Sequence, residues 1–418
     1  MSHTEKILSL IYFYFLLPVF TLYAYIVKNP KTQKYFESNG LLYLGDISSG
    51  YATDFLNGIG TTEIWTKLYN RVKQEKADFA GGDFIGHNFI IARKPSFIKS
   101  VLVKDASNFD RVHSLLSLKG DYIVSKSMVF MQGEDWKKTR AKFESAFTPS
   151  KVKRSFDQAN QLGKNLVAYL NRELDNDSEK GIDFRIAAHK FSLDSAGSST
   201  LSLDTASLQT REPSRFEQIS AKFFLSFDNF TNWWKPGLIQ LFPRIATYFK
   251  ITVIDKEIVQ FYGHIAKENM KNSGGDKNSN DFGGLVHSTW QELYWARTCK
   301  KEYAVPDTTL VLKAGDIIVI PLYGLHYDEE YHPNPEVFDP ERFSGANKDF
   351  TFLPFSQGPR NCIGIRMAMV QTKMMLCHVL RNFKLTPSPE THNPMKFIKS
   401  AFPVMDSEEV VVCCAKIE

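Results

Sequence analysis

One short segment combines the residue types that could deliver a metal ligand from a tight loop. It runs from Pro354 to Gly364 and is followed at once by an apolar pattern of helical period from Ile365 to Leu380. Cys362 therefore stands just before a predicted helix N-terminus, where unpaired N–H groups and the helix dipole favour an anionic sulfur. We expect a thiolate with a lowered pKa at this position.

The neighbours of Cys362 have complementary properties. Gly358 and Gly364 leave out side chains where a flat cofactor would come close to the backbone. Arg360 offers a guanidinium group to a carboxylate, and Phe355 can pack over the sulfur. The segment therefore predicts a thiolate ligand with a binding loop built around it.

A second pair of chemically useful residues is Trp136 and Arg140. They lie four residues apart in a predicted helix, Glu134–Phe147, so the indole and the guanidinium share one helix face. Both can therefore reach one carboxylate group.

Together these residues resemble the haem-thiolate signature of the cytochrome P-450 family, Phe-x-x-Gly-x-Arg-x-Cys-x-Gly. Its five fixed positions are matched by Phe355, Gly358, Arg360, Cys362 and Gly364. Five matches within ten residues disfavour the alternative that Cys362 is merely a small buried apolar residue. The resemblance implies that Cys362 is the axial ligand to the iron of haem b, where a thiolate favours O–O cleavage.

The resemblance extends to residues outside this segment. It implies that Trp136 and Arg140 bind one haem propionate and that Arg297 binds the other, although Arg297 can also be read as a surface arginine. Pro340–Phe343 resembles the Pro-Glu-Arg-Phe segment of the family, whose arginine, here Arg342, normally joins an ion-pair triad.

The elements that must position these residues are mostly helices. We expect a mainly α fold with small β-sheets, as in the cytochrome P-450 fold, and one domain over residues 29–418, because no repeat or flexible linker divides it. Further expected helices are Pro95–Leu102, Lys151–Leu174, Ser214–Leu225 and Thr252–Lys271, followed by a surface loop at Lys271–Asp281. Expected strands are a pair within Phe84–Arg93, a hairpin of Thr309–Leu312 with Ile317–Ile320, and a final strand at Val410–Ala415.

The N-terminus predicts a membrane anchor at residues 1–28. Ile7–Val27 is a 21-residue run without a charged side chain, long enough to span a hydrocarbon core of about 30 Å. A buried core helix is the alternative. Lys28, Lys31 and Lys34 follow the run and favour a cytosolic main domain. With the resemblance to the microsomal animal type, this implies a single-pass protein of the endoplasmic reticulum membrane.

Two motifs of the family are missing, so the sequence names no catalytic acid or alcohol. Gly58–Thr62 and Glu212–Arg215 match the central-helix motif and the Glu-x-x-Arg motif only in part, and both lie too early in the chain. We infer that a block on the order of 100 residues is lost between about Leu285 and Trp295. A missing exon, a gene-model error and a real short isoform remain open.

The resemblance implies a haem-thiolate monooxygenase that inserts one oxygen atom of dioxygen into a lipophilic small molecule. No dinucleotide or flavin fingerprint is present, so electrons from NADPH would come through a separate flavoprotein reductase. The alternative is an inactive or haem-binding-only shortened chain. Five basic residues form either a docking face for the reductase or ordinary solvated helix faces: Lys137, Lys138, Lys142, Arg366 and Lys373.

Charge and cysteine content indicate which binding partners and which cellular compartment are expected. The net charge of +5 fits anionic lipid or an acidic protein surface better than a nucleic acid. Five Cys in 418 residues make no disulfide framework, which indicates a reducing compartment. His326 and His332 are expected at the surface, so no zinc site is predicted. The family resemblance implies that three segments select the substrate: Phe109–Ser127, Phe216–Phe249 and Pro403–Asp406.

Overall fold

The structure is a computed structural model that describes most of the chain. It describes residues 30–47, 50, 54, 59–84, 87–112, 121, 124–176, 181–201, 203–228, 235, 239, 242–272, 294–344, 350–393, 395–397 and 407–417. The predicted anchor at residues 1–28, the interval 285–293 of the inferred loss and the segment Pro403–Asp406 lie outside these residues, as does most of the expected loop at Lys271–Asp281.

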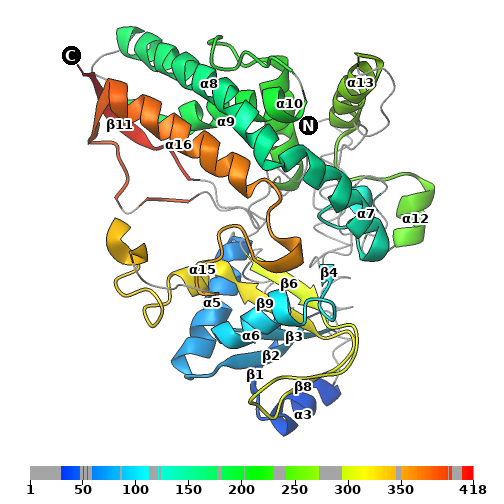
Figure 1. The fold of residues 1–418 in the computed structure, drawn as a ribbon. Helices are drawn as coiled ribbons and strands as arrows, with labels where there is room; N and C mark the ends of the chain where they lie inside the picture. Colours follow the sequence, from blue (N-terminus) through cyan, green and yellow to red (C-terminus); the bar gives the residue numbers. More distant parts are fainter. Residues whose placement is uncertain are drawn as a thin grey trace.

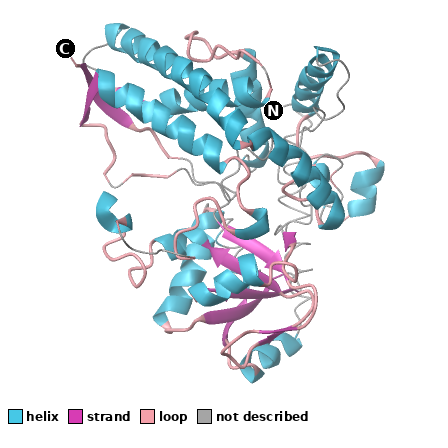
Figure 2. Ribbon diagram, in the orientation of Figure 1, coloured by secondary structure: helices cyan, strands magenta, loops and turns pink. Residues whose placement is uncertain are grey.

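Long helices gather at one end of the molecule and the largest sheet lies at the other, whereas β11 lies beside α16 at the helical end (Figures 1 and 2). The helices are α3 (Pro30–Ser38), α5 (Thr61–Gln74), α6 (Pro95–Lys99), α7 (Gly133–Glu144), α8 (Pro149–Asn176), α9 (Phe184–Thr200), α10 (Arg215–Asp228), α12 (Pro243–Tyr248), α13 (Lys256–Asn272), α15 (Leu322–His326) and α16 (Ile365–Asn382). Shorter turns are the π-helical η2 (Ser100–Lys104) and the 3-10 turns η4 (Val124–Lys126), η5 (Ser145–Phe147), η8 (Pro340–Phe343) and η9 (Gly358–Arg360).

The strands form three sheets. They are β1 (Leu42–Asp46), β2 (Phe79–Phe84), β3 (His87–Ala92), β4 (Arg111–Val112), β5 (Ile182–Asp183), β6 (Tyr294–Thr298), β7 (Tyr303–Ala304), β8 (Val311–Leu312), β9 (Ile317–Pro321), β10 (Phe383–Pro387) and β11 (Val411–Lys416). The largest sheet has the order β1-β2-β3-β9-β6-β4, with β1 parallel to β2, β3 parallel to β9 and the other neighbours antiparallel. β10-β11-β5 and β7-β8 form the two smaller sheets.

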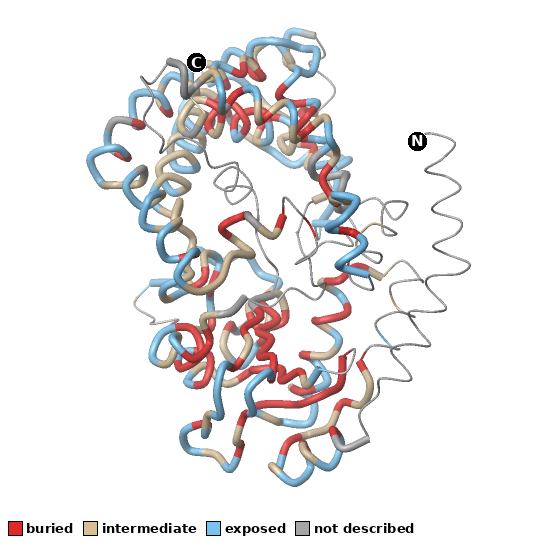
Figure 3. Tube along the Cα trace, turned by 90° about the vertical axis from the view of Figure 1, so that its right-hand side faces the viewer, coloured by how far each residue is buried: buried red, intermediate tan, exposed pale blue. Residues whose placement is uncertain are grey.

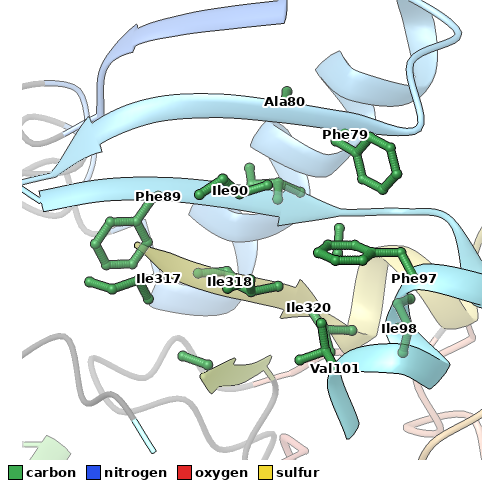
Figure 4. Packing of buried hydrophobic residues seen from close by; sticks show 14 of the residues in the cluster. Phe79, Ala80, Phe89, Ile90, Phe97, Ile98, Val101, Ile317, Ile318 and Ile320 are labelled. Atoms are coloured by element: carbon green, nitrogen blue, oxygen red, sulfur yellow. The ribbon is translucent and has the colours of Figure 1, made fainter. Parts of the chain in front are cut away.

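The principal apolar core lies around the six-stranded sheet. Figure 4 shows Ile90 of β3 and Ile318 of β9 near Phe97 and Val101, which come from α6 and η2. Phe97 also meets Phe79 edge to face, with ring centroids 5.0 Å apart. This packing fixes η2 against the sheet, and η2 in turn contacts η9 of the Cys362 loop.

A separate core joins the long helices. α8 and α16 pack along each other, with Leu166 and Leu170 of α8 buried together with Val379 of α16. Figure 3 shows buried residues both around the sheet and among the long helices. The helix that begins directly after the cysteine loop is thus held by an apolar contact with α8.

Most of the predicted helices are confirmed with shifts of a few residues at their ends. Thr252–Lys271 is the least accurate, because α13 begins only at Lys256. The final strand is confirmed as β11, and the turn of the predicted strand pair lies between β2 and β3. The larger part of β2 precedes Phe84 and was not predicted.

The predicted hairpin of Thr309–Leu312 with Ile317–Ile320 is wrong. β8 pairs with β7, whereas β9 enters the large sheet between β3 and β6. All five residues of β9 are buried, so the strand covers far more apolar surface there than it could against the two-residue β8. The turn residues after β8 redirect the chain without closing a hairpin.

No helix among the described residues is both long and apolar enough to cross a membrane. The apolar run Ile7–Val27 lies outside those residues, so the anchor stays a prediction.

Candidate functional site

The segment before α16 is a closed loop stapled by its own backbone. The N–H of Cys362 donates to the carbonyl oxygen of Phe355 at 2.9 Å, and the N–H of Asn361 donates to that of Gly358 at 3.0 Å. α16 begins three residues after Cys362, as the sequence predicts. The cysteine is therefore presented at the entrance to a helix by a loop of fixed shape.

The thiol of Cys362 does not have the lowered pKa that the sequence predicts. Burial raises the pKa of Cys362, and the backbone N–H of Gly364 and the charge of Arg140 oppose this effect without cancelling it. The helix entrance does contribute, but removal from water has the larger influence. A thiolate here needs a further positive charge beside it, such as a metal ion.

Arg140 is bound to the cysteine loop. Its Nη1 donates to the carbonyl oxygen of Asn361 at 2.9 Å, and its Nη2 donates to the side-chain oxygen of Asn361 at 2.8 Å. Its Nε donates to Glu144 one turn along α7 at 2.8 Å. This guanidinium thus connects α7 to the residue immediately before Cys362.

Arg360 approaches the same helix from the loop. Its guanidinium carbon lies 4.0 Å from the ring centre of Trp136, and its Nη2 donates to the carbonyl oxygen of Met131 at 2.9 Å. Arg140 lies 5.8 Å from the same buried indole ring. Trp136 therefore lies against two cations from two elements, and the structure brings Trp136, Arg140, Arg360 and Cys362 together.

The two glycines of the loop differ in how much room their surroundings leave for a side chain. Gly358 has φ of +76°, and a Cβ there would lie 1.8 Å from the carbonyl oxygen of Leu102 in η2. At Gly364 the nearest described atom to a Cβ would be Cε1 of Phe147 at 3.7 Å, an ordinary contact. The contact with η2 therefore requires glycine at 358, whereas the described residues give no steric reason for glycine at 364.

Comparison with known proteins decides the family. A sequence model described as cytochrome P450, here written cytochrome P-450, matches residues 55–286 and 291–413. The chain belongs to the cytochrome P-450 family. Members of this family are monooxygenases that bind haem, with an axial cysteine thiolate on the iron.

Relatives within the cytochrome P-450 family are distant but cover most of the chain. Cytochrome P-450 6k1 of Blattella germanica is 24% identical and covers 79% of this chain and 83% of its own length. Probable cytochrome P-450 6a13 of Drosophila melanogaster is 24% identical, covering 85% and 90%. Cytochrome P-450 3A31 of Mesocricetus auratus is 27% identical, covering 73% and 78%.

Each of these alignments has more positions than this chain has residues in it. The alignment with the Blattella cytochrome P-450 has 440 positions but uses 79% of 418 residues, which is about 330. About 110 positions of that relative therefore have no residue in this chain. The same arithmetic for the Mesocricetus protein, 402 positions and 73%, leaves about 97.

The other two arginines that the cytochrome P-450 resemblance singles out are Arg297 and Arg342, and both donate to backbone carbonyl oxygens. Arg297 is only 3% exposed on β6, so its reading as a surface arginine is wrong, and its Nη1 donates to the carbonyl oxygen of Ala296 at 3.0 Å. Arg342 donates to three carbonyl oxygens, those of Pro333, Asn334 and Val337. Backbone carbonyl oxygens thus hold Arg342, in place of the ion-pair triad that the resemblance implies.

His326 and His332 are likewise not surface residues. Nε2 of His326 accepts from the N–H of Leu353 at 2.9 Å, and burial lowers its pKa to about 4. Nε2 of His332 lies 3.0 Å from the carbonyl oxygen of Thr351. The two rings support the segment that leads to the cysteine loop. Within the described part of the chain, no group of three or more His, Cys, Asp or Glu could hold a metal ion.

Two residues of this cytochrome P-450 site were missed from the sequence. Asn361, which binds Arg140 through both its backbone and its side chain, lies inside the motif, and its amide next to Cys362 was a usable signal. Leu102, whose carbonyl oxygen excludes any side chain at Gly358, carries no such signal because its role is purely that of backbone.

Proposed function

We propose that this chain holds haem through Cys362 and acts as a monooxygenase on a lipophilic small molecule. The observation that supports this most strongly is the meeting of Cys362 with Arg140, Arg360 and Trp136 at the start of α16. It joins a sulfur ligand to two guanidinium groups, which are the natural partners of the carboxylate side chains of haem.

The shape of the loop also fits a flat cofactor. Gly364 leaves a space that a Cβ would enter without meeting any described atom closer than 3.7 Å. Haem iron, when bound, supplies the activation of dioxygen. Cys362, which is partly buried, would lose its proton to become the ligand.

The guanidinium groups would take the propionates. The guanidinium groups of Arg140 and Arg360 both lie within 6 Å of the centre of the Trp136 ring, so a cation–π contact with the indole holds each of them near the other. Arg297 is proposed to bind the second propionate. Its side chain is buried, which supports this role over that of an ordinary surface arginine. Phe355 fixes Cys362 through its carbonyl oxygen.

We propose that electrons from NADPH reach the haem through a flavoprotein reductase. The side chains of Lys138, Lys142, Arg366 and Lys373 are exposed on α7 and α16, the two helices that bear the cysteine site. Lys137 is exposed as well, but it pairs with Glu134 at 2.7 Å. An acidic reductase surface would pair with these exposed cations, and ordinary solvation of the two helix faces is the alternative.

We further propose a location on the endoplasmic reticulum membrane, anchored by Ile7–Val27 with residues 29–418 in the cytosol. The length and apolar character of this run support it. The lysines that follow the run support the orientation.

A second candidate is a shortened chain that binds haem without turnover. The family match stops at residue 286 and resumes at 291, and about 100 aligned positions of the relatives have no residue here. Exposed apolar side chains support the loss of a covering block, because Leu376 and Leu380 of α16 are 46% and 59% exposed and Phe338 is 93% exposed.

Turnover separates the two candidates. The full chain, loaded with haem, would be combined with a flavoprotein reductase, NADPH and phospholipid, and oxygenated product of a lipophilic probe would be measured. Product that is lost in Cys362→Ala supports the monooxygenase. Stable haem binding without product supports the second candidate.

A further inference from the structure

α3 lies next to β8, away from the cysteine loop (Figure 1). A pocket of about 460 Å³ is lined by residues of α3 and of the segment that carries β7 and β8. Its lining includes Lys34, Tyr35, Ser38 and Asn39 on one side and Glu302 and Lys313 on the other. The pocket is largely open to solvent.

The floor of the pocket is fixed by hydrogen bonds. The hydroxyl of Tyr35 lies 2.8 Å from both the carbonyl oxygen of Val311 and Oδ2 of Asp316, and Nδ2 of Asn39 donates to the carbonyl oxygen of Tyr35 at 2.8 Å. The ammonium of Lys313 lies 4.4 Å from the centre of the Tyr35 ring. One cation is thus held over an immobilised aromatic surface.

The charges around the pocket have mixed signs. Lys34 and Lys313 supply two ammonium groups and Glu302 supplies one carboxylate, and all three side chains are exposed. The buried Asp316 accepts from the backbone N–H of Lys313 at 2.7 Å and from Asn88 at 2.9 Å, so hydrogen bonds stabilise its carboxylate. A ligand that carries a phosphate and a cation within a few ångströms of each other matches this pattern.

The position of α3 in the sequence indicates where such a ligand is found. α3 begins at Pro30, three residues after Val27 ends the apolar run. Three residues span at most about 11 Å, and Lys34 lies about 6 Å further along the helix. The polar layer on each side of a bilayer is roughly 5–8 Å thick. The pocket is therefore within reach of lipid headgroups, provided that the proposed anchor spans the membrane.

We infer that this pocket binds the headgroup of a zwitterionic phospholipid, with its phosphate between Lys34 and Lys313 and its cation beside Glu302. The site would fix the rotation of the main domain about its anchor. This inference rests on the membrane location proposed above but not on haem or turnover.

The test uses the full chain in a maltoside detergent, which carries no phosphate. Binding of glycerophosphocholine, the soluble headgroup, is followed by saturation-transfer NMR on the choline methyl signal. The double variant Lys34→Ala with Lys313→Ala should weaken binding at least about fivefold, because charge-assisted contacts to phosphate are lost. Glu302→Gln should weaken glycerophosphocholine but not glycerol 3-phosphate.

Controls separate the outcomes. Lys153→Ala with Lys267→Ala removes two exposed lysines of other helices and should leave binding unchanged. Equal displacement by inorganic phosphate would overturn the headgroup assignment in favour of free phosphate, and an unaffected double variant would overturn the site. Flotation of the full chain with phosphatidylcholine vesicles tests the anchor separately, so failure of the anchor is told apart from failure of the pocket.

Discussion

At the scale of single residues, the cysteine site depends on a small number of directional contacts. Arg140 reaches across from α7 to both polar groups of Asn361, and Gly358 accommodates the backbone of η2. Gly364 makes no comparable contact with the described protein. These differences allow the roles in folding and in cofactor binding to be separated by substitution.

The two glycines form a matched pair for such a test. Gly358→Ala should destabilise the protein without haem by at least about 2 kcal/mol, because positive φ and a clash with Leu102 act together. Gly364→Ala should leave that stability within about 0.5 kcal/mol and lower haem content instead. Denaturant unfolding and the ratio of haem to protein measure the two effects. Equal loss of haem with no difference in stability would contradict this account.

Arg140→Ala should reduce haem retention more than it changes iron ligation. A charge-assisted contact to a propionate contributes about 1.5–3 kcal/mol, so haem affinity should fall by roughly 10- to 100-fold. Arg140→Lys keeps the charge but loses the two-pronged contact with Asn361, and should give an intermediate result. Haem content that does not change in Arg140→Ala would remove this residue from the propionate site.

Haem binding should release one proton, which comes from the thiol of Cys362. Because burial raises the pKa of this thiol, the chain without haem holds the proton at neutral pH. Affinity for haem should therefore rise by about tenfold per pH unit until the pH passes the pKa of Cys362. In Cys362→Ser this dependence should disappear. A pH-independent affinity in the unaltered chain would mean that the sulfur is not the ligand.

At the scale of elements, α16 has one covered face and one bare face. Val379 is 1% exposed against α8, whereas Leu376 and Leu380 are about half exposed.

All six residues of the strand β2 are buried, and Gly81 and Gly82 lie in its middle. A Cβ at these positions would lie 2.1 Å from Phe36 and 2.5 Å from Ile47. The two glycines weaken the strand signal, which is why the first half of the β2–β3 pair was not predicted.

The bare face of α16 yields a prediction of its own. Leu376→Gln with Leu380→Gln should change the free energy of unfolding by no more than about 0.5 kcal/mol per site and increase the monomeric fraction. Val379→Gln on the same helix should cost at least about 2 kcal/mol, since it buries an amide against α8. Chemical unfolding and gel filtration report these effects. A double variant as damaging as Val379→Gln would show that the face is covered.

At the scale of the molecule, local motifs were predicted better than the contacts that assemble them. The loop from Phe355 to Gly364 and the helices around it follow from residue types and period. The placement of β9 in the large sheet does not, because it depends on pairing with β3 and β6 far along the chain. The burial of Arg297, the raised pKa of Cys362 and the carbonyl partners of Arg342 likewise arise only from packing.

The inferred internal loss concerns the whole molecule as well. The interrupted family match and the unpaired alignment positions support it, and the exposed apolar side chains of α16 are consistent with it. The cysteine loop itself is nevertheless complete, since its supports come from η2, α7 and α16. Haem binding can therefore be tested independently of turnover.

The most direct test is the carbon monoxide difference spectrum of the reduced full chain, expressed with haem supplied. This account predicts a strongly red-shifted Soret band of the thiolate type, which is absent in Cys362→Ser. A band typical of a neutral or imidazole ligand in the unaltered chain, or a thiolate band that survives in Cys362→Ser, would contradict the assignment of Cys362 as the ligand.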